Sequence, residues 1–263
     1  MDVVFLGTNN YGREIYEWLC DRDGVDVRAM LTEASQLDLV AAIEPDVVVA
    51  AGFTHIVPPE VLSVPPDGCL NVHPGILPET RGYNPNVWSI VDDLPAGATV
   101  HYMDEGVDTG DVVATREVET SFADTGKDVY RRVERACVDL FREVWPAVES
   151  GTVEARSQAD EAGSYHRKQD FLDLCELDPD EEVRVVDFLD RLRALTFPPF
   201  DNARIEVDGR AYYVDVEIRA ADADEHDDAD GDVDGSGDGG GDSDDVGGGG
   251  SGENGRYGTV SSY

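Results

Sequence analysis

Short apolar segments alternate with helical patterns over the first fifty residues, and this alternation constrains the fold more than any other feature. Val3–Gly7, Val25–Leu31 and Asp46–Gly52 have the length and apolar content of strands, and the first and third are nearly unbroken apolar runs, as expected for buried parallel strands. Tyr11–Arg22 and Leu37–Ile43 lie between them and carry apolar residues at helical spacing. The order strand, helix, strand, helix, strand predicts right-handed crossovers and a parallel, doubly wound α/β sheet.

The middle of the chain continues the same pattern. Ala98–Met103 and Asp111–Glu119 are predicted strands, and Thr125–Ser150 carries the apolar stripe of a long amphipathic helix. Thr125 or the residue before it can cap the start of this helix, and Gly151 follows its end. We expect this helix to close the N-terminal domain against the sheet.

The C-terminal third predicts a smaller unit. Residues 152–182 are polar and are interpreted as an irregular connector, and Val183–Leu195 is a predicted helix. Asp208-Gly209 separates Arg204–Val207 from Arg210–Ile218, which predicts a hairpin. The edge of this hairpin could pair two copies into a homodimer, or its charge could prevent pairing.

The last 44 residues differ from the rest of the chain. They hold 13 acidic residues and one arginine, with 13 of the 27 glycines. Such a composition predicts a disordered tail, because it buries too little apolar area to offset the entropy of ordering. The predicted organisation is therefore a Rossmann-like domain over 1–160, a connector with a small helix-and-hairpin module over 161–219, and a disordered Asp/Gly-rich tail over 220–263.

The charge of the chain limits its partners and its setting. Acidic residues outnumber basic ones by 57 to 20, the formal net charge is −37, and the only lysines are Lys127 and Lys168. A strongly acidic, lysine-poor surface is typical of a halophilic cytoplasmic protein, because high salt screens the repulsion between carboxylates. An acidic protein from an ordinary environment, with a very acidic tail, is the alternative. Charge of this sign argues against a nucleic-acid partner.

Other sequence features agree with a cytoplasmic enzyme. No apolar run is long enough for a transmembrane helix, and Met1–Gly7 enters a strand directly rather than forming a signal peptide, so no membrane association is expected. The four cysteines have no Cys-x-x-Cys or Cys/His ligand spacing. We therefore expect reduced thiols and no metal site.

The turn after the first strand is a candidate anion site. Backbone amides of Gly7-Thr8-Asn9-Asn10-Tyr11-Gly12 could hold an anion at a helix N-terminus, although a tight strand-to-helix turn explains the same residues. Asn9 stands where the dinucleotide fingerprint has its second glycine, so NAD is not an expected cofactor.

Two polar constellations follow predicted strands. Asn71 and His73 come after an apolar segment and lie on one face of it, where an amide and an imidazole could stabilise an oxyanion. Asp108 lies between two glycines in a turn 35 residues after His73, from which its carboxylate could orient that imidazole and raise its pKa. A satisfied strand-end histidine and an ordinary Asp turn explain the same residues.

Several motifs together resemble the formyltransferase family that uses 10-formyltetrahydrofolate. They are Asn-x-His-Pro at 71–74, Leu-Pro at 77–78, Arg-Gly-x-x-Pro at 81–85 and Gly-Val-Asp-Thr-Gly-Asp at 106–111, within a similarity that extends from about Met1 to Ile218. The resemblance implies that Asn71, His73 and Asp108 are catalytic, that 10-formyltetrahydrofolate is the co-substrate, and that no metal is needed. The folate-binding residues that it implies are Phe53, His55, Ile56, Val57, Gly106 and Val107.

Within that family, Pro85-Asn86-Val87-Trp88 is most similar to the nucleotide-sugar N-formyltransferases, whereas methionyl-tRNA formyltransferases usually carry an aliphatic residue at position 86. The resemblance thus implies formyl transfer to the amine of a dTDP-linked amino deoxysugar, with Arg81 and Arg13 as candidate phosphate partners. The implied substrate-binding residues are Arg81, Gly82, Asn86, Trp88, Gly7 and Thr8.

Two departures from the family pattern bear on the acceptor. Gly75 stands where serine is common, and the segment between Leu31 and Asp46 is short where relatives often carry a longer loop. The alternatives are formyl transfer to methionyl-tRNA or another amine, formyltetrahydrofolate hydrolysis, and a catalytically silent nucleotide-sugar binding protein. Among the other histidines, His101 is interpreted as a satisfied strand residue and His166 as a surface residue of the connector.

Overall fold

A computed structural model describes residues 1–158 and 162–221 of the chain. Its centre is a six-stranded sheet in the order β2-β1-β3-β4-β6-β7. The strands are β1 Asp2–Leu6, β2 Asp26–Leu31, β3 Val47–Ala51, β4 Cys69–His73, β6 Gly97–Tyr102 and β7 Val112–Glu117. The α/β class and the parallel character of the first four strands are confirmed, but β6 and β7 run antiparallel to their neighbours, so the sheet is mixed.

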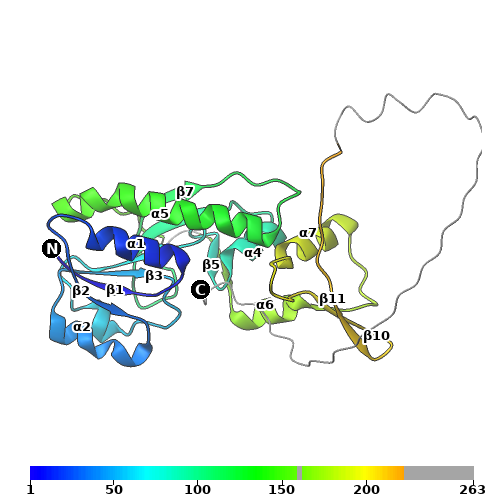
Figure 1. Cartoon of the computed structure of the whole chain (residues 1–263), viewed down its shortest axis with the longest axis horizontal. Coiled ribbons are helices and arrows are strands. Elements are labelled where there is room, and N and C mark those ends of the chain that lie inside the picture. The colour runs from blue at the N-terminus through cyan, green and yellow to red at the C-terminus, as the bar shows by residue number, and fades with distance from the viewer. Residues whose placement is uncertain (159–161, 222–263) are drawn as a thin grey trace, which may run out of the picture.

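Alternate side chains of the buried strands enter two different cores, one on each face of the sheet. On β1, Val3 and Phe5 belong to the larger core, whereas Val4 and Leu6 belong to the smaller one. Helix α1 (Asn10–Cys20) and helix α5 (Gly126–Ser150) cover the larger core, and α2 (Asp38–Ile43) and α3 (Pro59–Leu62) cover the smaller. Figure 1 shows α5 and α2 on opposite sides of the sheet. This burial on both faces explains why the strands are apolar throughout.

Helix α5 has the boundaries that its sequence predicts. The Thr125 hydroxyl accepts a hydrogen bond from the Asp128 amide, the Asp128 carboxylate accepts one from the Thr125 amide, and Gly151 adopts the left-handed conformation at φ 64°. The apolar stripe of α5 includes Phe141 and Trp145, both fully buried against the sheet. The helix therefore closes the N-terminal domain as expected.

The prediction that residues 152–182 are irregular is wrong in the part that the structure describes. This segment contains β8 (Ser164–His166), α6 (Lys168–Cys175) and β9 (Glu176–Leu177). These elements are too short to have a clear sequence period, and tertiary contacts stabilise them. β8 pairs in parallel with β5 (Thr80–Gly82), and α6 buries Phe171 and Cys175 in the larger core.

The C-terminal module contains α7 (Val185–Leu195) and a three-stranded sheet in the order β11-β10-β9. The hairpin of β10 (Arg204–Val207) and β11 (Arg210–Tyr213) turns at Asp208-Gly209, where both residues have positive φ, as a two-residue hairpin turn requires. β11 ends earlier than predicted. Helix α4 (Pro85–Val91) packs against α7 and joins the module to the N-terminal domain. The predicted disordered tail lies outside the described residues except for its first two.

Replacing Thr125 by alanine should lower the free energy of unfolding by about 1 kcal/mol, because the substitution removes the N-cap of α5. Thr125→Ser, which keeps the capping hydroxyl, should retain most of the stability. Chemical denaturation in molar potassium chloride measures the free energy of unfolding of both variants and of the wild type. Equal loss in the two would contradict a capping role for the hydroxyl group.

Candidate active site

The catalytic residues predicted from sequence meet in one cavity of about 590 Å³. It opens at the carboxyl ends of β3 and β4, where ligands of open α/β sheets bind. Asn71, His73 and Asp108 all line it. Because β4 contributes the first two residues and the β6–β7 loop contributes the third, the sheet brings together groups that are 35 residues apart in the chain.

The antiparallel pairing of β4 with β6 sets the environment of Asn71. In this register Asn71 lies opposite His101, and the Asn71 Nδ2 atom is 3.0 Å from His101 Nε2. His101 Nδ1 is 2.7 Å from the Tyr102 carbonyl oxygen, to which it donates. His101 Nε2 then accepts from the Asn71 amide, so the imidazole holds Asn71 in place. His101 is thus a buried, partnered strand histidine, but it also lines the cavity beside the predicted trio.

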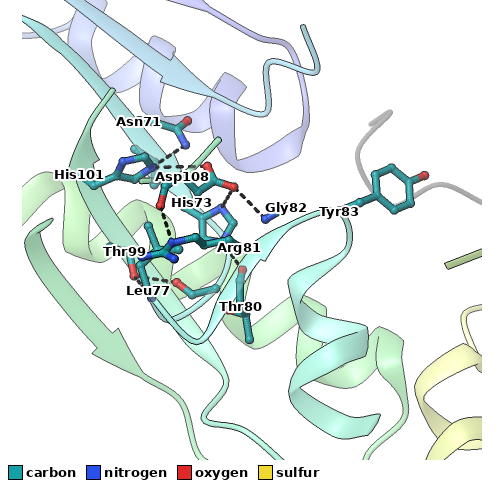
Figure 2. A network of polar contacts seen from close by, with 12 residues as sticks. Asn71, His73, Leu77, Thr80, Arg81, Gly82, Tyr83, Thr99, His101 and Asp108 are labelled. Carbon is teal, nitrogen blue, oxygen red and sulfur yellow. Dashed lines mark hydrogen bonds and ion pairs between the residues drawn. The ribbon is translucent and has the colours of Figure 1, made fainter. Parts of the chain in front are cut away.

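The Asp108 carboxylate lies between two imidazoles, as Figure 2 shows. Its Oδ2 atom accepts a hydrogen bond from the Gly82 amide at 2.9 Å and lies 3.6 Å from His73 Nδ1. Its Oδ1 atom lies 3.6 Å from His101 Nε2. His73 Nε2 donates to the Thr80 carbonyl oxygen at 2.8 Å. The predicted contact between Asp108 and His73 is therefore present, and both nitrogens of His73 face oxygen atoms.

The backbone of Asp108 has a left-handed conformation, with φ at 57°, and two side chains hold it there. Arg81 Nε donates to the Asp108 carbonyl oxygen at 3.2 Å, and Arg81 Nη2 donates to Gln158 Oε1 at 2.9 Å. The buried Gln158 amide donates in turn to the carbonyl oxygens of Asp108 and Gly110. The guanidinium of Arg81 therefore supports the loop that carries Asp108.

Burial and charge act in opposite directions on the ionisable groups. Burial alone would raise the pKa of Asp108, but the two imidazoles and the Gly82 amide outweigh it, so this pKa lies below its ordinary value. Burial lowers the pKa of His73 and exceeds the opposing effect of the Asp108 charge. The expected effect of Asp108, which is to raise the pKa of His73, is therefore present but smaller than the lowering caused by burial. At neutral pH Asp108 is therefore ionised.

All the residues predicted to bind folate line the cavity. They are Phe53, His55, Ile56, Val57, Gly106 and Val107. The ring of Phe53 packs edge-on against His55 with centroids 5.2 Å apart, and Ile56 is largely exposed. This loop after β3 presents aromatic and aliphatic groups to the cavity, which suits a flat, largely apolar ligand.

The residues predicted to bind the acceptor substrate divide into two groups. Gly82 and Asn86 line the cavity, whereas Arg81, Trp88, Gly7 and Thr8 are not part of its lining. Trp88 Nε1 donates to the Tyr83 carbonyl oxygen at 2.8 Å, and the indole ring stacks on His166.

The backbone amide of Gly7 is not available to an anion, because it donates to the Leu31 carbonyl oxygen at 3.0 Å. Gly7 has φ at 116°, and a Cβ atom there would lie 2.1 Å from the Ala51 carbonyl oxygen, so the turn needs glycine for close packing. Asn9 and Tyr11 line the cavity instead, and Asn9 Oδ1 caps α1 by accepting from the Gly12 amide. Arg13, the other candidate phosphate partner, is exposed beside Glu17 and is not part of the cavity lining.

Sequence reasoning missed His101, Asn84 and the segment from Tyr165 to Lys168, all of which line the cavity. His166 was predicted to lie on the surface, but it is partly buried: it stacks on Trp88, and its Nε2 atom is 3.1 Å from Asp92. The register of β4 with β6 and the pairing of β8 with β5 bring these residues to the site, and neither pairing has a local sequence signal. Among the described residues, no group of three or more His, Cys, Asp or Glu side chains could hold a metal ion.

Replacing Asp108 by asparagine should lower the pKa of His73 further, because the substitution removes the carboxylate charge that opposes the effect of burial. NMR titration of the histidine ring signals measures this pKa. Asp111→Asn is the matched control, since Asp111 is exposed in the same loop, and it should leave the His73 titration unchanged. A higher or unchanged His73 pKa in Asp108→Asn would contradict this electrostatic account.

Comparison with known proteins shows which family this chain resembles. Residues 14–144 match the family model "Formyl transferase", and residues 170–220 match "N-formyltransferase dimerization C-terminal domain". The dTDP-4-amino-4,6-dideoxyglucose formyltransferase of Mycobacterium tuberculosis is 39% identical over 149 residues, which span 56% of this chain and 63% of that enzyme. A methionyl-tRNA formyltransferase of Bacillus mycoides is 34% identical over 213 residues, with 66% of this chain and 68% of that enzyme covered.

Two solved structures extend the comparison. A Mycobacterium tuberculosis protein for which sugar N-formyltransferase activity is suggested matches 84% of this chain and 98% of its own, with a TM-score of 0.76 and 30% identity. The formyltransferase PseJ of Anoxybacillus kamchatkensis, in complex with UDP-4,6-dideoxy-4-formamido-L-AltNAc and tetrahydrofolate, matches 65% of this chain and 87% of its own, with a TM-score of 0.55 and 29% identity. The chain belongs to the formyl transferase family.

Proposed function

We propose that this protein transfers a formyl group from 10-formyltetrahydrofolate to the amine of a nucleotide-linked amino deoxysugar. The observation that carries the proposal is the convergence of Asn71, His73 and Asp108 in one cavity, with the Asp108 carboxylate next to both imidazoles. The relatives named as amino-sugar formyltransferases, and the PseJ complex with a formamido sugar nucleotide and tetrahydrofolate, support this choice of substrates.

In the proposed reaction the sugar amine attacks the formyl carbon, a new C–N bond forms, and the bond from that carbon to the folate nitrogen breaks. The Asn71 amide has a second N–H besides the one directed at His101, and it can donate to the developing oxyanion. The ionised Asp108 carboxylate can accept the proton that the amine loses. Asp108 can hand this proton on to the imidazole of His73, and His73 can donate a proton to the leaving folate nitrogen, so both groups end as they began and no net proton is consumed.

The cavity offers a separate wall to each substrate in this proposal. The loop Phe53–Val57, together with Gly106 and Val107, would hold the folate, and Gly82 and Asn86 lie where the acceptor would bind. The acceptor amine would then approach the formyl carbon next to Asp108. Arg81 would act on the reaction through the position of Asp108 rather than through a phosphate group.

Methionyl-tRNA is the second candidate acceptor, because methionyl-tRNA formyltransferases also match this chain. The net charge of −37 favours the sugar nucleotide, since a tRNA backbone presents many phosphates and a sugar nucleotide only two. The same charge, with its scarcity of lysine, supports a halophilic cytoplasmic protein. Among the described residues, no helix combines the length and the apolar character needed to cross a membrane.

We further propose that the protein is a homodimer assembled through the C-terminal module, which matches the dimerization domain model. β11 is the outer strand of its sheet, and all four of its residues are exposed. Exposed large apolar side chains are frequent in this module and would be covered by a second copy. They are Val183, Val185, Val186, Val207, Tyr212 and Tyr213.

Release of tetrahydrofolate from 10-formyltetrahydrofolate, measured across a panel of dTDP- and UDP-amino sugars in molar potassium chloride, tests the formyl-transfer proposal. Turnover should depend on one amino sugar. His73→Ala should lower it by about 100- to 1,000-fold, since loss of a group that transfers a proton in the reaction has an effect of that size. Asp108→Asn should also lower turnover strongly, whereas Asp111→Asn, which changes an exposed carboxylate in the same loop, should retain it.

Other outcomes of this assay identify the alternatives. Release without any amine would show a hydrolase, and transfer to methionyl-tRNA would show the tRNA enzyme. Sugar-nucleotide binding without turnover would show a silent binding protein. Near wild-type turnover in His73→Ala would contradict the catalytic assignment.

The dimer is tested by sedimentation equilibrium. Tyr212→Asp should shift the protein towards the monomer, because it places a charge on the exposed face of β11. Leu39→Asp is the matched control, since Leu39 is a similarly exposed apolar residue on α2 of the N-terminal domain, and it should leave the mass unchanged. A monomeric wild-type protein would overturn the proposal.

A further inference from the structure

The segment from β8 into the first turn of α6 forms one wall of the cavity, through Tyr165, His166, Arg167 and Lys168. Two sets of contacts hold it. β8 pairs residue by residue with β5, and the Tyr83 amide donates to the His166 carbonyl oxygen at 2.8 Å. The His166 ring stacks on Trp88 with centroids 3.8 Å apart and an interplanar angle of 6°. This wall is therefore built into the fold.

The same short strand positions both this wall and the Asp108 carboxylate. Gly82 on β5 donates its amide hydrogen to Asp108, and in the β5–β8 register Gly82 lies opposite His166. Gly82 adopts φ of 93°, and a Cβ atom on it would lie 2.2 Å from the His166 carbonyl oxygen. A ligand that contacts the β8–α6 segment is consequently held at a fixed position relative to Asp108.

Arg167 and Lys168 are the two arginine or lysine side chains that line the cavity in the part of the chain described by the structure. Lys168 is exposed and makes no hydrogen bond or ion pair with any described residue, although the protein is strongly acidic. Arg167 is also exposed and pairs with Asp170 at 3.1 Å, a contact that solvent screens and that a phosphate can replace. Two cationic groups at a cavity within such an acidic chain point to an anionic ligand.

Tyr165 adds an aromatic surface beside these charges. It lines the cavity and is 53% exposed, and its ring lies close to the glycine backbone at Gly82. A flat aromatic group with an open face can stack on a nucleobase and contributes binding free energy with little sequence or base preference. An aromatic ring next to two cations matches the base and the diphosphate of a nucleotide.

We propose that Tyr165, Arg167 and Lys168 form the nucleotide subsite of the acceptor: the tyrosine ring stacks on the base, and the two cations bind the diphosphate. This inference rests on the proposed function and adds to it the residues that select a nucleoside diphosphate. It also reassigns the phosphate contact from Arg81, whose guanidinium is engaged by the Asp108 and Gln158 oxygens. Strand β5 then connects the phosphate-binding residues at the rim of the cavity with Asp108, because it pairs with β8 and donates a hydrogen bond to the Asp108 carboxylate.

Calorimetric titration of the full-length protein with dTDP and with UDP, without folate, tests the subsite directly. Each of Lys168→Ala and Arg167→Ala should weaken binding by about 10-fold or more, as expected for loss of a charge-assisted contact to phosphate. Lys168→Arg should restore most of the affinity. Lys127→Ala removes the only other lysine, whose Nζ contacts the Pro198 carbonyl oxygen, and should bind like the wild type.

Steady-state kinetics test the nucleotide subsite separately from the proposed formyl transfer, on which the subsite depends. With the active amino sugar, Lys168→Ala should raise KM for the sugar nucleotide and leave kcat close to wild type, since the contact is uniform in the ground and transition states. Thermal unfolding of the variants should match that of the wild type, because both cations are exposed.

Three results would overturn the subsite. The first is wild-type formyl transfer together with unchanged dTDP and UDP affinity and unchanged KM in both cation variants, which would leave the function standing. The second is an increase in KM for 10-formyltetrahydrofolate alone, which would assign the cations to the folate carboxylates. The third is no measurable binding of either nucleotide to the wild type. A further outcome is that the wild type transfers no formyl group but the cation variants bind dTDP and UDP more weakly than it does. That result would support the subsite and contradict the proposed reaction.

Discussion

The hydrogen bond from the Gly82 amide to the Asp108 carboxylate is the interaction on which the rest of the site depends. It fixes one oxygen of a buried carboxylate, and this leaves the group oriented towards His73 and His101. Arg81 and Gln158 hold the same residue from its backbone side. Because strand β5 supplies the amide and also pairs with β8, the loop that carries Asp108 and the cationic wall of the cavity are held by the same strand.

Burial of an ionised carboxylate is costly unless hydrogen bonds and opposite charge compensate for it. Here the compensation comes from one backbone amide and two imidazoles, and the pKa of Asp108 falls despite the burial. The same burial lowers the pKa of His73, and the charge of Asp108 only partly opposes this effect. An ionised carboxylate beside an imidazole suits the movement of a proton between an amine and a leaving nitrogen.

The cavity rim carries two cationic side chains, Arg167 and Lys168, on a protein that is otherwise strongly acidic. Most described arginines form ion pairs or hydrogen bonds on an acidic surface, whereas Lys168 stands without a partner among the described residues at the cavity rim. An acidic surface repels polyanions at long range, and high salt shortens that range to a few ångströms. A small ligand with two phosphates can still be bound by two local cations, and a large polyanion meets the repulsion of the whole surface.

The sequence by itself determined the class of the fold and singled out the three candidate catalytic residues. Apolar runs such as Val47–Ala51 form strands buried on both faces, and the Asp208-Gly209 pair forms the hairpin turn, because these are local consequences of side-chain period and backbone freedom. The spacing of Asn71 and His73 on one strand placed both on the cavity side, and the family motifs singled out Asp108.

Only the tertiary structure decided how the rest of the site is assembled. The antiparallel direction of β6 placed His101 against Asn71, and the pairing of β8 with β5 carried Tyr165 and Lys168 to the cavity. Strand direction and the pairing of a three-residue strand depend on contacts between segments far apart in the chain, which leave no periodic signal in either segment. The same holds for Arg81. Its residue type suggests a phosphate ligand, but in the folded protein its guanidinium donates hydrogen bonds to the Asp108 carbonyl oxygen and to Gln158.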